Sequence, residues 1–131
     1  MEKMRLKIIT VISLVLLLCC SGAYAATVGE IFSPDDASYK EWGNGNRYGI
    51  AVELSTIRQQ GDVITCQSIF FDRYTRIIMD IFDDEIIELS DGKIEVVMSN
   101  RPNVIVDTNS RPGSEWVRLY KIMKAKLADD N

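Results

Sequence analysis

Apolar residues between Arg47 and Val106 recur mainly at every second position, and this alternation constrains the fold more than any other feature. Side chains two residues apart lie on the same face of a β-strand. Alternating or β-branched apolar runs occupy residues 48–54, 63–71, 75–82, 85–89, 94–98 and 104–106. We therefore expect an antiparallel sheet of about five to six strands.

Turn-forming residues separate these runs and set their order. Gln60-Gly61-Asp62 predicts the turn of a hairpin, and Ser90-Asp91-Gly92 predicts a second one, because Asp and Gly tolerate positive φ angles. Asp83-Asp84 is interpreted as a third turn, between the runs 75–82 and 85–89. The run at Val104–Val106 follows Pro102, which favours an edge position for this last strand.

The final segment has a different period. Trp116, Leu119, Tyr120, Met123 and Leu127 recur at three- and four-residue spacing, which is typical of one face of a helix. Strands followed by one amphipathic helix predict an α+β domain, with the C-terminal helix packed on one sheet face. We expect this domain at residues 47–131, after an irregular lead-in at residues 26–46.

The N-terminal residues have the pattern of an export signal. Three basic residues fall within the first seven, an apolar run follows at Val11–Cys20, and Ala23-Tyr24-Ala25 matches a cleavage site. The apolar run is shorter than the roughly 20 residues that a membrane-spanning helix needs. These features predict a cleaved signal peptide at residues 1–25, a mature N-terminus at Ala26, and location in the periplasm or at the cell surface without a membrane span.

The charge and the cysteine content of the mature chain limit the kinds of partner and the covalent links that we expect. Residues 26–131 contain 12 basic and 18 acidic side chains, so nucleic acid is not an expected partner. Cys66 is the only cysteine after residue 25, which rules out an intramolecular disulfide in the mature chain. Cys66 is then either buried or available for an intermolecular bond.

The sequence contains no histidine, which excludes Ser-His and Cys-His nucleophiles and most zinc or copper sites. It also lacks a glycine-rich phosphate loop, and we expect no cofactor, no metal and no enzymatic activity. The carboxylates that remain lie close together in the chain: Asp80, Asp83, Asp84, Glu85, Glu88 and Asp91. We interpret them as a solvated hairpin edge whose charges discourage sheet association, with a small carboxylate-dependent hydrolase as the alternative.

Basic residues are concentrated on the predicted helix. Arg118, Lys121 and Lys124 recur every three residues, away from the apolar stripe. They form a candidate binding site for an anionic partner such as a sulfated polysaccharide. The alternative is an ordinary solvent-exposed helix face.

Two short stretches carry a family resemblance across roughly residues 47–127. One is Leu54-Ser55-Thr56-Ile57-Arg58 with Gly61-Asp62-Val63-Ile64, and the other is Arg111-Pro112-Gly113-Ser114 before the helix. With these, the chain resembles the surface-adhesin protein E family. The resemblance implies export, an antiparallel sheet with a C-terminal helix on one face, and binding to a host extracellular-matrix protein.

The same resemblance implies a disulfide between helix and sheet. This sequence departs from it, because Ala125 or a neighbour stands where the helix cysteine would be, which leaves Cys66 without a partner. The sequence as a whole predicts an exported, adhesin-like binding domain. A periplasmic assembly factor or inhibitor of the same fold is the alternative.

Overall fold

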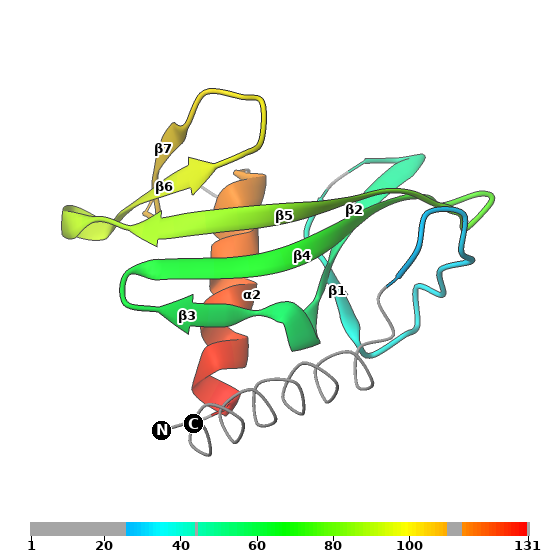
Figure 1. Ribbon diagram of the computed structural model, residues 1–131, viewed down its shortest axis with the longest axis horizontal. Coiled ribbons are helices and arrows are strands. Elements are labelled where there is room, and N and C mark those ends of the chain that lie inside the picture. The colour runs from blue at the N-terminus through cyan, green and yellow to red at the C-terminus, as the bar shows by residue number, and fades with distance from the viewer. Residues whose placement is uncertain (1–25, 44, 110–113, 131) are drawn as a thin grey trace, which may run out of the picture.

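The computed structural model describes residues 26–43, 45–109 and 114–130, so the predicted signal peptide lies outside the described residues. Within these ranges, a seven-stranded antiparallel sheet is crossed on one face by the helix α2 (Figure 1). This confirms the α+β class, with more strands than expected. The elements are β1 (Tyr39–Glu41), β2 (Tyr48–Glu53), β3 (Arg58–Gln60), β4 (Val63–Asp72), β5 (Ile78–Glu88), β6 (Lys93–Val97), β7 (Val104–Asp107) and α2 (Glu115–Asp129).

The two longest strands, β4 and β5, form the middle of the sheet. They pair from Val63 opposite Ile87 to Phe71 opposite Ile78, and the full order is β1-β2-β4-β5-β6-β7. The predicted turn at Asp83-Asp84 is wrong, because β5 continues through both residues. The apolar, β-branched residues on either side of this pair keep the chain extended.

The two predicted turns are confirmed, and they lie at the same end of this strand pair. The chain reverses after β5 at Ser90–Gly92, where Asp91 and Gly92 have φ angles of 64° and 70°. Beside it, the turn at Gly61-Asp62 joins β3 to β4, and the backbone N–H of Glu88 donates to the backbone oxygen of Asp62 at 2.7 Å. β2 also pairs with β4, and a short 3-10 turn at Leu54–Thr56 interrupts the edge between β2 and β3.

The main core lies between α2 and the sheet. Val117, Leu119 and Met123 are the buried residues of the helix. Trp116, Tyr120 and Leu127 are partly buried and pack against the same core, so the predicted apolar stripe is confirmed. The sheet and β1–β2 side of this core consists of Trp42, Val52, Ile57, Ile64, Cys66, Ile86, Ile94 and Val96.

A second core lies in the segment predicted to be an irregular lead-in. β1 belongs to this segment, and Phe32 packs with its ring centroid 4.5 Å from that of Phe71. Ala51 and Ile69 complete this cluster from β2 and β4. The strands therefore carry buried side chains on both faces, and Glu53 on β2 is also buried. This burial raises the pKa of the Glu53 carboxyl.

The last strand has the predicted edge position. β7 pairs only with β6 among the described strands, and 62% of the Ile105 surface is exposed. No helix in the described part of the chain is long and apolar enough to cross a membrane.

Candidate functional site

A pocket opens where α2 begins and leaves part of the sheet face uncovered. Its volume is about 520 Å³. Residues two apart on the strands line its floor, and the first turn of α2 and the segment after β6 supply its sides. The apolar lining residues are Trp42, Ile50, Phe70, Phe82, Met98 and Trp116. All of these except Trp42 are only partly buried, so they present apolar surface to the cavity.

The register of the sheet explains which side chains meet there. Phe70 lies opposite Ile50 on one side and opposite Asp80 on the other. Ser68 is opposite Phe82 and shares the same face, because it is two residues from Phe70. Aromatic and polar side chains therefore alternate along and across the strands on the part of the helix-side face that α2 does not cover.

A chain of hydrogen bonds runs beneath this lining. The Trp42 indole N–H donates to the Ser68 hydroxyl at 3.2 Å, and that hydroxyl donates to Oδ2 of Asp84 at 2.6 Å. The Cys66 thiol reaches the same oxygen at 3.7 Å. Asp84 is 2% exposed and lines the pocket, so this carboxyl forms part of its floor.

The environment of Asp84 changes the acidity of two groups. Burial raises the pKa of Asp84 to about 6, although the hydrogen bonds from Ser68 and Cys66 oppose the rise. Burial and the charge of Asp84 raise the pKa of the Cys66 thiol, which is therefore kept in its unreactive protonated form.

Cys66 is a free, buried cysteine, which is the first of the two predicted alternatives. Met123 shares the core with Cys66, whereas Ala125 is exposed on α2. On the helix side of this core, a methionine therefore shares the buried cluster with Cys66.

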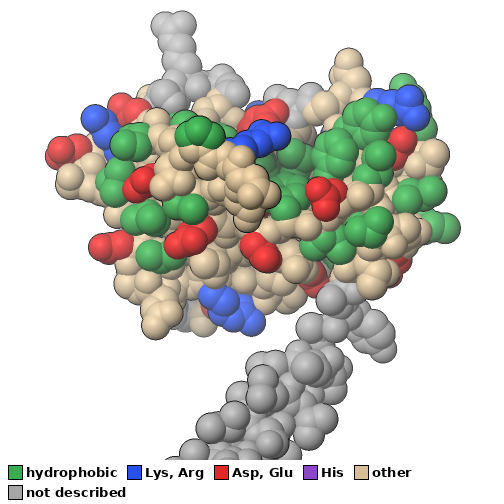
Figure 2. Space-filling model, turned by 45° about the horizontal axis from the view of Figure 1, so that its top comes forward, with side chains coloured by type: hydrophobic (Ala, Val, Ile, Leu, Met, Phe, Trp, Pro, Cys, Tyr) green, Lys and Arg blue, Asp and Glu red, His purple; other side chains and the backbone are tan. Residues whose placement is uncertain are grey.

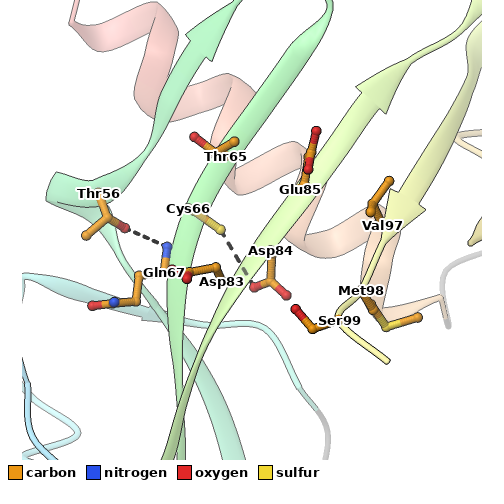
Figure 3. Close-up of a pocket in the computed structure, with 10 residues that line it drawn as sticks. All are labelled: Thr56, Thr65, Cys66, Gln67, Asp83, Asp84, Glu85, Val97, Met98 and Ser99. Atoms are coloured by element: carbon orange, nitrogen blue, oxygen red, sulfur yellow. Dashed lines mark hydrogen bonds between the residues drawn. The ribbon is translucent and has the colours of Figure 1, made fainter. Parts of the chain in front are cut away.

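A second depression of about 500 Å³ lies on the opposite, open face of the sheet (Figure 3). Thr65 and Gln67 on β4 face Glu85 and Asp83 on β5 in the register. The backbone N–H of Gln67 donates to the Thr56 hydroxyl at 2.9 Å. These side chains are polar or charged and stand on an open surface, so this depression has fewer apolar contacts to offer a ligand than the pocket beside α2.

The acidic run is a sheet edge only in part. Residues 85–88 of β5 pair with both β4 and β6, whereas Asp80, Asp83 and Asp84 lie where β5 pairs only with β4 among the described strands. Asp80 and Asp83 are exposed there, as the interpretation of a charged edge requires, but Asp84 is buried on the helix face, so for this residue the interpretation is wrong. Asp83 and Glu85 line the depression on the other face. The run is thus divided between the two sheet faces.

The geometry does not support carboxylate-dependent hydrolysis. Asp80 and Asp84 line the same pocket. They are four residues apart on one strand, about 13 Å along its axis, beyond the roughly 5–9.5 Å that paired glycosidase carboxyls require. Glu88 lies further along β5, where the Tyr120 hydroxyl donates to it and holds the pKa of its carboxyl below the usual range.

The predicted basic site on α2 is partly used within the protein. Arg118 donates from a guanidinium N–H to the backbone oxygen of Trp42 at 3.1 Å. Lys124 forms an ion pair with Glu88 at 3.3 Å. Lys121 is exposed. Two of the three cations thus fasten the helix to the rest of the domain, and the surface presents less positive charge than the sequence suggested.

These contacts predict unequal effects on stability. Arg118→Ala is expected to lower the free energy of unfolding by about 1–3 kcal/mol, because it leaves the Trp42 carbonyl without this charged donor. Lys121→Ala is expected to change it by less than about 0.5 kcal/mol, as is usual for an exposed side chain. Urea denaturation of the two variants measures the difference. Equal effects would show that the Arg118 contact does not support the fold.

Apolar and acidic surfaces adjoin on this protein. On the face shown in Figure 2, hydrophobic side chains gather in patches with acidic side chains between them. The pocket has the same mixed character, because Asp80, Asp83, Asp84 and Glu115 line it beside the aromatic residues. Arg101 is the one basic residue in its described lining.

The described residues contain no group of three or more potential metal ligands. No family model matches the chain, and no curated protein or solved structure matches it at significant similarity.

The sequence did not reveal this pocket. Its lining comes from the segment before β2, from β2, β4 and β5, from the segment after β6 and from the start of α2. One sequence feature could have indicated it. Asp84 stands two residues from Phe82 on one side and from Ile86 on the other, so its alternation with these apolar residues places an acidic side chain on a buried strand face. Interpreting Asp83-Asp84 as a turn concealed it.

Proposed function

We propose that the protein is an exported, non-enzymatic and adhesin-like binding domain that holds part of a partner protein in the pocket beside α2. The observation that carries this proposal is the set of half-buried aromatic and aliphatic side chains around a cavity of about 520 Å³. Cavities of this size, mostly apolar with a few polar groups, are typical ligand-binding sites. Aromatic residues such as Trp116 also carry much of the binding energy at protein interfaces.

Further support comes from the sequence. The basic N-terminal residues, the apolar run and the Ala23-Tyr24-Ala25 motif favour export. The resemblance to the surface-adhesin protein E family favours an extracellular-matrix protein as the partner. The internal contacts of Arg118 and Lys124 make the pocket a better candidate surface than the basic helix face.

An assembly factor or inhibitor of the periplasm would use a similar pocket for a different partner. The location of the mature protein separates this alternative from an adhesin. Surface labelling of intact cells marks an adhesin and leaves a periplasmic factor unlabelled. The mass of the purified mature protein, expected to begin at Ala26, tests export itself.

Two tryptophan substitutions test the site. Ser99 is exposed and lines both this pocket and the depression on the other face, so Ser99→Trp adds bulk at the mouth of both without replacing a core residue. Lys121→Trp places the same bulk on the basic helix face, at another exposed position. We expect Ser99→Trp to weaken binding to immobilised matrix proteins at least about tenfold, and Lys121→Trp to leave it unchanged.

Thermal denaturation of both variants serves as the control for folding, and both should melt close to the unmodified protein. The proposal fails if Ser99→Trp binds as well as the unmodified protein. A loss confined to Lys121→Trp would return the binding site to the helix face. If the unmodified protein binds no matrix protein at all, the adhesin assignment is withdrawn.

A further inference from the structure

The charge of the pocket is unbalanced. The carboxyl groups of Asp80, Asp84 and Glu115 line it, against the single guanidinium of Arg101 on the segment after β6, whereas the Asp83 side chain points to the other face of the sheet. Among the described residues, no lysine or arginine forms an ion pair with Asp80 or Asp84. A pocket with uncompensated negative charge attracts cations and repels anions.

Asp84 places part of this charge inside the cavity. Both of its hydrogen bonds, from Ser68 and Cys66, end on Oδ2. Within the described part of the chain, no donor reaches Oδ1. Because Asp84 is 2% exposed and lines the pocket, a ligand with N–H groups would supply the donors that this oxygen lacks.

The walls add a second reason for a cation. Phe70, Phe82 and Trp116 are half-buried aromatic side chains in the lining. The faces of aromatic rings attract ammonium groups, most strongly where water is excluded. Ile50 and Met98 add aliphatic surface to the same lining, which suits a methylene chain. Carboxylates at the floor and apolar walls together match a positive charge carried on an alkyl stem.

We propose that this pocket binds an alkylammonium group, with the ammonium toward Asp84 and the alkyl stem along the aromatic walls. This inference rests on the pocket being the binding site of the proposed function, and it names the chemistry that the partner presents. In a partner protein, the group is a lysine side chain. A free alkylamine carries the same chemistry, and the two sources are distinguished below.

Intrinsic fluorescence reports occupancy directly, because the two tryptophans of the chain, Trp42 and Trp116, both line the pocket. We expect hexylammonium to change this fluorescence with an affinity of about 1 mM at pH 7.5, as is usual for a ligand of this size. Hexanoate, which has the same stem and the opposite charge, should give no saturable change. Hexanol should bind at least about fivefold more weakly than hexylammonium, because it lacks the charge.

Three variants assign the charges. Asp84→Asn is expected to weaken hexylammonium binding about five- to tenfold, whereas Asp80→Asn, whose residue lies about 13 Å away along β5, is expected to weaken it less than about twofold. Arg101→Gln serves as the matched control, because it removes a charge of opposite sign from the same pocket and should strengthen ammonium binding. The melting curves of all three variants establish that any loss is not a loss of folding.

Two peptides separate the sources. A short peptide with one lysine should compete with hexylammonium if the natural ligand is a protein side chain, and the same peptide with glutamate in place of lysine should not. Competition by free alkylamines alone points to a small amine as the ligand. The inference is overturned if hexanoate binds and hexylammonium does not, or if Asp84→Asn leaves ammonium binding unchanged. Either result leaves the Ser99→Trp test of the proposed function standing, so the two failures are distinguishable.

Discussion

Replacing Trp42 with alanine is expected to lower the free energy of unfolding by about 3–5 kcal/mol. Trp42 is 1% exposed and belongs to the core beneath α2. Its backbone N–H donates to Ile50 at 2.9 Å, and its ring centroid lies 5.1 Å from that of Trp116. The substitution removes a large buried ring and also removes a donor from the hydroxyl of Ser68.

Urea denaturation of the alanine variant measures this effect. Trp116→Ala is the matched comparison, and it is expected to cost less, about 1–2 kcal/mol, because Trp116 is only partly buried. Trp42→Phe keeps most of the apolar contact and loses the indole N–H, with an expected cost of about 1–2 kcal/mol. A loss below about 1 kcal/mol for Trp42→Ala would mean that this residue does not anchor the helix to the sheet.

The second large effect concerns the pH dependence of stability. Burial raises the pKa of Asp84 to about 6 from the ordinary value of 3.8 for an aspartate. A raised pKa means that the folded protein binds the proton more tightly than the unfolded chain does. The protonated carboxyl therefore contributes stability below about pH 4, and this contribution is lost as the pH rises to about 6. The total is on the order of 3 kcal/mol.

Asp84→Asn isolates this contribution, because an amide has no charge to desolvate and still accepts a hydrogen bond from Ser68. Relative to the unmodified protein, we expect this variant to gain about 2–3 kcal/mol between pH 4 and pH 7. Urea denaturation at several pH values gives the difference between the two proteins, in which the contributions of other carboxyls cancel. A difference that does not change with pH would show that Asp84 is ionised as easily in the folded protein as in water.

The period of the apolar residues predicts the fold class well, because it depends on local geometry. Alternation before residue 106 and helical spacing after residue 115 identified most of the strands and the helix. Alternation assumes that one face of a strand is buried and the other is in water. β2 violates this assumption, since Val52 and Ala51 are buried in different cores. The lead-in that covers the second core therefore could not be recognised from the strands.

The interpretation of Asp83-Asp84 failed for a related reason. Consecutive acidic residues favour turns, but in β5 they point to opposite faces, where one is buried with Ser68 and the other is exposed. Two hydrogen bonds offset part of the free energy needed to bury the Asp84 carboxyl, and its raised pKa favours the uncharged form. Neither effect can be inferred from the residues next to Asp84 in the sequence. The pocket itself depends on where α2 begins across the sheet, which is a tertiary property.

An NMR titration tests most directly whether the pocket is the binding site. It follows the amide and indole signals of the protein as a matrix protein that binds to it is added. Binding in the pocket predicts that the indole N–H signal of Trp116 shifts first, together with the amides of Phe82, Met98 and Ser99. The amide of Lys121 should stay unchanged. Shifts confined to Lys121 and its neighbours on the exposed side of α2, with both tryptophan indole signals unmoved, would contradict it.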